Sequence, residues 1–108
     1  MSLKALTKVS SFTGMEFGIF KLKDGVSESD MLKAAQLADE MFLSKEEGFL
    51  GHVVLKGKDG VYADVAFATT QQKAEEVCGK WMDNEYTMKY IEAIEPDSVN
   101  LSFWERVK

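Results

Sequence analysis

Apolar positions along this chain follow the strand period in some segments and the helix period in others. Met15–Lys23 is rich in strand-forming residues, and both of its alternating sets are largely apolar, as in a strand buried on both faces. Over 31–42 apolar side chains recur at helical spacing, and Ser27 precedes them as a candidate N-cap. Alternation returns in Phe49–Lys56 and Val61–Ala68, so the pattern predicts a strand, a helix and a β-hairpin in that order.

A second helical stretch and a last strand follow the hairpin. Thr69 is the candidate N-cap, and Asp83-Asn84 is expected to interrupt the helix before a second helical piece that ends at Pro96. Val99–Val107 alternates again and predicts the final strand.

The length of the hairpin loop decides which side chains share a face. A three-residue loop of Lys58, Asp59 and Gly60, with the glycine in the left-handed conformation, pairs Gly57 with Val61. One face of the hairpin is then wholly apolar: Gly51, Val53, Leu55, Ala63, Val65 and Phe67. The other face carries Leu50, His52, Val54, Tyr62, Asp64 and Ala66. A two-residue turn would mix these sets, so the longer loop is preferred.

The element order β-α-β-β-α-β predicts an α+β, ferredoxin-like domain over 15–108, a four-stranded antiparallel sheet with two helices on one face. Residues 1–14 are weakly patterned and are expected to form an N-terminal arm, or a short strand through Ala5–Val9. We expect the helices to cover the purely apolar sets of Val53, Leu55, Val65, Phe67, Leu101 and Phe103. The opposite, bare face would then show Phe20, Leu50, Val54, Tyr62, Ala66 and Trp104.

An apolar sheet face of that size normally marks an interface or a ligand surface. We therefore expect a homodimer in which two sheets pack face to face around a cavity that holds a small molecule. Two alternatives stay open: the face remains partly solvated, or the N-terminal arm folds over it.

Composition and charge narrow the partners. The formal net charge is -5 and Lys and Arg are scattered, so neither nucleic acid nor an anionic membrane is an expected partner. Cys78 is the one cysteine, which excludes an internal disulfide and fits a reducing, cytoplasmic location. We find no signal-peptide pattern and no apolar run of roughly 18 residues, the length of a membrane span.

Four short segments, in this order, resemble one known family. They are Phe20–Val26 before the first helix, Glu47–Gly51 at the second strand, Asp59–Val65 at the third and Ile94–Val99 before the last. Together they are similar to the dimeric α/β barrel proteins, in particular to an uncharacterised branch like the antibiotic biosynthesis monooxygenases. The resemblance covers about Met15 to Val107 and implies the fold more firmly than the activity.

His52, the only histidine, is the strongest catalytic candidate. By the hairpin register it lies diagonal to Asp64, a carboxylate that would orient its ring and suit it to act as a general base. Glu16 is a second acid candidate. We expect the substrate to contact Tyr62, Trp104, Phe20, Glu16, Ser102 and Asn100.

Each candidate also has a purely structural interpretation. His52 and Asp64 would then be a satisfied buried pair, and Trp104 a dimer contact. Cys78 is expected to be inert core, and the pairs Asp39-Glu40 and Glu75-Glu76 to be solvated helix surface.

Two functions remain open at this point. The first is an enzyme, a cofactor-independent monooxygenase or an isomerase acting on a small aromatic or polyketide-like molecule. The second is a non-catalytic small-molecule-binding or interaction protein. No cofactor is expected: Cys and His are too few for a structural zinc site, no Gly-rich phosphate loop or flavin fingerprint is present, and the helices lack the His of haem-binding relatives.

Overall fold

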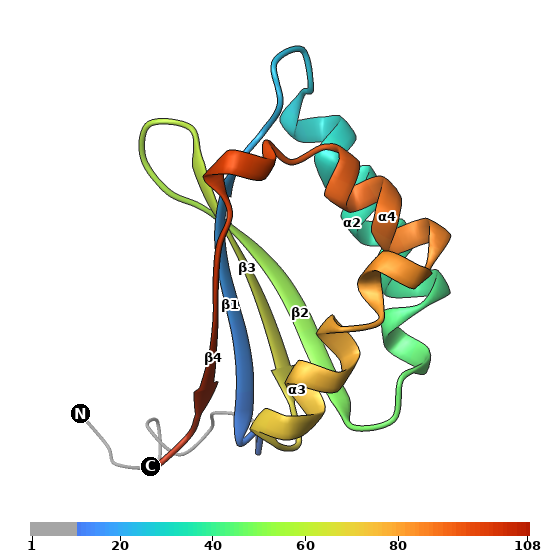
Figure 1. Ribbon diagram of the computed structural model, residues 1–108, viewed down its shortest axis with the longest axis vertical. Coiled ribbons are helices and arrows are strands. Elements are labelled where there is room, and N and C mark those ends of the chain that lie inside the picture. Colours follow the sequence, from blue (N-terminus) through green and yellow to red (C-terminus); the bar gives the residue numbers. More distant parts are fainter. Residues whose placement is uncertain (1–10) are drawn as a thin grey trace, which may run out of the picture.

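The computed structural model describes residues 11–108 and shows an α+β, ferredoxin-like fold (Figure 1). The strands are β1 (Gly14–Lys21), β2 (Phe49–Lys56), β3 (Val61–Ala68) and β4 (Asn100–Glu105). The helices are α2 (Glu28–Met41), α3 (Gln71–Cys78) and α4 (Glu85–Glu92), with short 3₁₀ turns η1 (Leu43–Lys45), η2 (Trp81–Asp83) and η3 (Pro96–Ser98). The suggested strand at Ala5–Val9 lies outside the described residues.

The four strands form one antiparallel sheet in the order β2-β3-β1-β4. The predicted hairpin register is confirmed, since Leu55 lies opposite Ala63 and Val53 opposite Val65. Gly60 has a positive φ of 79°, which glycine adopts without steric cost and which closes the three-residue loop. A bulge between Phe49 and Gly51 shifts the register at the start of β2.

Side chains at the helix ends explain where the helices begin. Ser27 caps α2 as predicted, because its side-chain oxygen accepts a hydrogen bond from the Asp30 amide at 3.0 Å. The second helix is capped by Thr70, one residue beyond the predicted Thr69, since the Thr70 hydroxyl accepts from the Lys73 amide. The predicted interruption is confirmed at Asn84, whose side chain caps α4.

All three helices lie on one face of the sheet and leave the other face bare (Figure 1). The prediction of which hairpin face they cover was wrong. Phe20, Tyr62 and Ala66 are buried beneath the helices, whereas Val53 and Leu55 are 44% and 52% exposed on the bare face. Val54 packs partly against the core, and Leu50 is exposed beside the bulge.

The inversion has a physical cause. The wholly apolar set was assigned to the core because apolar burial drives folding. The set that the helices cover contains polar residues that bond to one another, so their burial leaves few groups without partners. On β4 the predicted side is confirmed, because Leu101 and Phe103 pair with Gly18 and Glu16 on the helix side, but Leu101 is still 44% exposed.

The main core forms between β1, β3 and the helices. Its largest fully buried side chains are Tyr90, Phe20, Met31 and Leu43. Within residues 11–108 no helix is long and apolar enough to cross a bilayer.

Close packing at Gly14 fixes how α3 meets the sheet. A Cβ built on Gly14 would lie 2.0 Å from the Thr70 carbonyl oxygen, a backbone atom that cannot move independently. We predict that Gly14→Ala lowers the free energy of unfolding by about 1–3 kcal/mol, the usual cost of overpacking, measured by urea denaturation. Gly51→Ala is the matched control, because nothing lies within 4 Å of its Cβ position. Equal stability of the two variants would contradict this packing argument.

Candidate functional site

A cavity of about 330 Å³ lies between the sheet and the helices. Its walls are mostly apolar and come from β1, β4, α3, α4 and the turns between them: Ile19, Phe20, Trp81, Met82, Ile91, Ile94, Val99 and Leu101. Polar groups enter it from Glu16, Asp64 and Tyr90. A few convergent polar groups in an apolar pocket of this size are typical of a small-molecule site.

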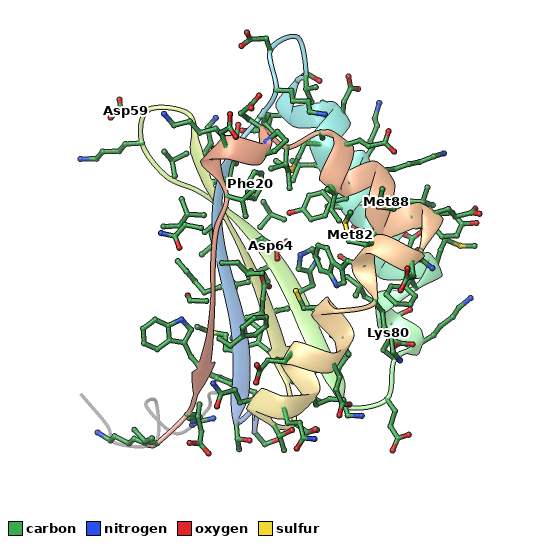
Figure 2. The ribbon with its side chains drawn as sticks, in the orientation of Figure 1. Phe20, Asp59, Asp64, Lys80, Met82 and Met88 are labelled. Atoms are coloured by element: carbon green, nitrogen blue, oxygen red, sulfur yellow. The ribbon has the colours of Figure 1, made fainter. Side chains whose placement is uncertain are left out.

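Asp64 is at the centre of the polar groups. Its side chain extends from β3 toward the helices (Figure 2), and the residue is 5% exposed. Its Oδ1 accepts hydrogen bonds from His52 Nε2 and, at 2.7 Å, from the Tyr90 hydroxyl. Its Oδ2 has no partner among the described residues. One oxygen of Asp64 is thus held firmly while the other still has acceptor capacity.

His52 connects Asp64 with Asp39 on α2. Its Nδ1 lies 2.6 Å from Asp39 Oδ1, and its side chain is 2% exposed whereas that of Asp39 is 33% exposed. The rings of Trp81 and Tyr90 pack edge-on against the imidazole, with centroids 6.0 Å and 5.9 Å away. These contacts fix the ring between two carboxylates, one near solvent and one facing the cavity.

The two carboxylates set the charge of His52. Burial alone would lower its pKa, but the hydrogen bonds to Asp39 and Asp64 more than offset this and raise the pKa to about 10. His52 is therefore protonated at neutral pH and donates through both ring nitrogens. Burial acts in the opposite sense on Asp64, yet its bonds with His52 hold its pKa below the ordinary value, so Asp64 is ionised.

Glu16 is the second buried carboxyl of the cavity. It is 4% exposed, and burial together with the charge of Asp64 raises its pKa to about 10. Glu16 is therefore protonated at neutral pH, and the neighbouring charge of Asp64 helps to keep it so. Its Oε2 has no partner in the described part of the chain. The two carboxyls form a pair that holds one proton in common, here called the Glu16–Asp64 pair.

Gly18 leaves room beside this pair. A Cβ on Gly18 would lie 3.1 Å from Glu16 Oε1 and 3.2 Å from Leu101 Cδ1, so any side chain there would fill the cavity next to the carboxyls. Cys78, at the end of α3, also lines the cavity, and burial raises its pKa to about 12, which keeps the thiol neutral.

The structure brings some of the predicted site residues together. Glu16, Phe20 and Asp64 line the cavity, and Asp64 stands between His52 and the cavity space. Tyr62 is buried beneath the helices but donates its hydroxyl to Glu28 at 2.8 Å, outside the cavity lining.

The other predicted contacts lie elsewhere. Asn100, Ser102 and Trp104 lie on β4 opposite Ile19, Phe17 and Met15 of β1, and none of the three lines the cavity. Trp104 is 56% exposed and donates its indole N–H to Ser102. The expectation that one cavity, between two sheets, joins these residues to His52 was therefore wrong for the single chain, because the hairpin faces are inverted.

Sequence reasoning missed three residues of the site. Asp39 was assigned to solvated surface, but it bonds His52. Tyr90 and Trp81 lie among apolar residues of the second helical stretch, and nothing in such a pattern distinguishes a tyrosine that bonds a buried carboxylate from one that only packs. A signal for Asp39 existed in principle: an acid on the helix that covers a strand histidine is a natural partner for it. Among residues 11–108 no three His, Cys, Asp or Glu side chains are grouped so that they could hold a metal ion.

The fold is the ferredoxin-like one that is also found in antibiotic biosynthesis monooxygenase-like structures. A candidate antibiotic biosynthesis monooxygenase from Bordetella bronchiseptica has a TM-score of 0.72 at 13% identity, over 90% of this chain and 99% of that one. SnoaB, a cofactor-independent oxygenase from Streptomyces nogalater, has a TM-score of 0.68 at 12% identity, over 90% and 95% of the two chains. A candidate antibiotic biosynthesis monooxygenase from Nitrosomonas europaea reaches 0.64 at 13% identity, over 88% and 99%. No protein-family model and no curated protein matches the chain. At these identities the likeness establishes the shared fold.

The raised pKa values predict how stability depends on pH. Glu16 rises from an ordinary 4.5 and His52 from 6.5, each to about 10, so the native state holds their protons more tightly than the unfolded chain. The stabilisation from Glu16 is complete below pH 4.5 and that from His52 below pH 6.5; both are lost as pH rises toward 10. We expect the free energy of unfolding to fall between pH 7 and 9, by at most about 1.4 kcal/mol per pH unit for each proton.

Urea denaturation at a series of pH values measures this slope. Glu16→Gln keeps the shape of the protonated side chain but cannot titrate. The free energy of unfolding of this variant should therefore fall less steeply with pH, by up to the slope that one proton contributes. Asp64, whose pKa is lowered, acts only at the acid end, where its contribution is lost as pH falls through its native-state pKa. A wild-type stability that is flat from pH 7 to 9 would show that the buried cluster does not hold these protons.

Proposed function

We propose that this protein is a cofactor-independent monooxygenase that acts on a small aromatic or polyketide-like molecule bound in the cavity. The observation that supports it is the Glu16–Asp64 pair: two buried carboxyls that line an apolar cavity, each with one oxygen that has no partner among the described residues. Oxygenation without a cofactor requires a substrate that can be deprotonated to an electron-rich carbanion, and a dry site with a strong base serves that step.

The chemistry can be written in two balanced stages. The pair that has lost its shared proton takes a proton from a substrate CH₂ group that is acidified by a neighbouring carbonyl. The resulting carbanion gives electrons to O₂ and forms a C–O bond, the peroxide anion takes the proton back from the pair, and the hydroperoxide then loses water. The net change is that a CH₂ group and O₂ become a C=O group and H₂O. An isomerase would use the same proton transfer and return the proton to another atom.

The hydrogen bonds from Asp64 through His52 to Asp39 connect the Glu16–Asp64 pair with the partly exposed Asp39 carboxylate. Asp64 has a lowered pKa and is by itself a weak base, so basicity depends on the raised pKa values of Glu16 and His52. His52 as the proton acceptor stays a prediction, and in this arrangement it would act through Asp64. Because these groups titrate together, the pH profile reports the cluster and not one residue.

Oxygen uptake by the purified protein, without added cofactor, tests this proposal on a panel of aromatic ketones and polyketones. We expect kcat/KM to rise with pH toward about 10, the pKa of the cluster. Asp64→Asn removes one carboxyl of the pair and the charge that helps to raise the pKa of Glu16, so it should lower kcat/KM by about 100-fold or more, the usual effect of losing general-base catalysis. His52→Ala, if it keeps the fold, should also lower turnover and change the pH profile.

Tyr62→Phe is the matched control. Tyr62 is a buried residue of the same strand, two positions from Asp64, but its hydroxyl bonds Glu28 and not the pair. It should keep turnover within about threefold of the wild type, whereas Tyr90→Phe removes a donor to Asp64 and should not. Unchanged turnover in Asp64→Asn would exclude the pair from the reaction.

A non-catalytic binding protein is the second candidate, and one observation favours it. Both ring nitrogens of His52 are already paired with carboxylates, as in a buried structural pair. A ligand that binds the cavity, with no oxygen uptake or isomerisation across the panel, would support this candidate over the enzyme.

We also propose that the bare face packs against a second copy of the chain. Val53, Leu55 and Trp104 are among the exposed apolar side chains of that face, and a self-complementary sheet interface would bury them. In this arrangement Trp104 is a dimer contact.

Light scattering with size-exclusion chromatography tests the dimer. We expect the mass of two chains for the wild type and of one chain for Val53→Glu, because a charge would be buried in the interface. Leu32→Glu is the control: Leu32 is 43% exposed on α2, on the helical side, against 44% for Val53. A single-chain wild type, or dissociation by the control alone, would contradict the proposed interface.

A further inference from the structure

The cavity has acceptors in its polar region and nothing to balance an added negative charge. The described residues that line it include no Lys, Arg or His, and its charged or chargeable lining groups are Glu16, Asp64, Cys78 and Tyr90. An anionic ligand would therefore meet an ionised Asp64 in a site of low polarity, which is costly.

The unpartnered atoms indicate what the site does accept. Glu16 Oε2 and Asp64 Oδ2 are buried, lack hydrogen-bond partners among residues 11–108, and belong to residues that are 4% and 5% exposed. An ammonium group has three N–H donors and no acceptor, so it can bond both carboxyls of the cavity lining and leave both ionised.

The walls fit the rest of such a molecule. Phe20, Trp81 and Tyr90 surround the polar groups with aromatic rings, which attract cations and pack against apolar bodies. Gly18 leaves the space beside the carboxyls open, because any Cβ there would stand within 3.2 Å of Glu16 and Leu101.

We infer that the cavity binds an aromatic or apolar molecule with a protonated amine, which displaces the proton shared by Glu16 and Asp64. The inference rests on the same cavity as the proposed function but not on its chemistry. A bound ammonium would occupy the base, so the amine is a ligand that competes with the proton and not the molecule that is oxygenated.

Displacement of the proton makes binding depend on pH. Glu16 titrates among groups from every neighbouring element: Asp64 on β3, His52 on β2, Cys78 on α3 and Tyr90 on α4, with uncharged Phe103 opposite it on β4. Of these, Asp64 raises the pKa of Glu16 and His52 lowers it. Each bound ammonium should release one proton, so affinity should rise about tenfold per pH unit until the amine itself loses its charge.

Three probes with one body and different head groups test the inference by titration calorimetry. They are 2-(aminomethyl)naphthalene, 2-(hydroxymethyl)naphthalene and 2-naphthoate. At pH 8 we expect the amine to bind about tenfold or more tightly than the alcohol, and the carboxylate not to bind. Measurements in two buffers of different ionisation heat should show about one proton released for the amine and none for the alcohol.

Variants show which residues are responsible for amine binding and for proton release. Glu16→Gln keeps the shape of the protonated residue, and it should abolish proton release and lower amine affinity by about tenfold. Gly18→Ala keeps both carboxyls but narrows the space, so it should weaken the amine and the alcohol alike, whereas Gly51→Ala should change neither. Because Glu16→Gln and Gly18→Ala affect separate features, misfolding of one leaves the other as a test.

Equal binding of amine and alcohol, tighter binding of the carboxylate, binding without proton release, or no binding of the amine at millimolar concentration would each overturn the inference. Its failure is distinguishable from that of the proposed function. Amine binding without oxygen uptake on any substrate supports the inference alone, and oxygen uptake that Asp64→Asn abolishes, with no amine binding, supports the function alone.

Discussion

The hydrogen bond between His52 and Asp64 is the interaction on which the rest of the structure depends. It joins β2 to β3 beneath the helices, and each partner reaches a helix: His52 bonds Asp39 on α2, and Asp64 accepts from Tyr90 on α4. A buried ion pair contributes little net stability against an apolar replacement, but losing one partner leaves an uncompensated charge and costs about 3–5 kcal/mol. The contact therefore specifies how the helices sit on the sheet more than it adds to the stability of the fold.

Much of the fold could be predicted from the sequence because its signals are local. The three-residue loop with Gly60 determines the hairpin register, and caps such as Ser27 determine where helices begin. The face of the hairpin that the helices cover is not a local property. Apolar pattern favoured Val53 and Leu55, but the polar face is the buried one because Asp39 and Tyr90, remote in sequence, bond its histidine and carboxylate.

The same limit applies to the candidate site. His52 and Asp64 were found as a pair because the register places them diagonally on one face. Glu16 was found because alternation along the strand places it on the same face as Phe20. Its high pKa, however, follows from burial against Asp64, which the pattern does not reveal. Tyr90 and Trp81 needed the packing of α4 and η2 to be known. Contacts between side chains of the helices and side chains of the sheet therefore cannot be predicted from periodicity, whereas contacts within one sheet can.

The two faces of β1 link the cavity to the bare face. Glu16, Gly18 and Phe20 line the cavity, whereas Met15 and Phe17, which pair with Trp104 and Ser102 of β4, do not. Any displacement of this central strand moves both sets, since the side chains share one backbone. The position of Glu16 relative to Asp64, and with it the shared proton, is therefore set by two packing surfaces at once. A molecule that covers the bare face would restrain the strand that holds Glu16 without touching the cavity, which makes assembly and site chemistry parts of one physical system.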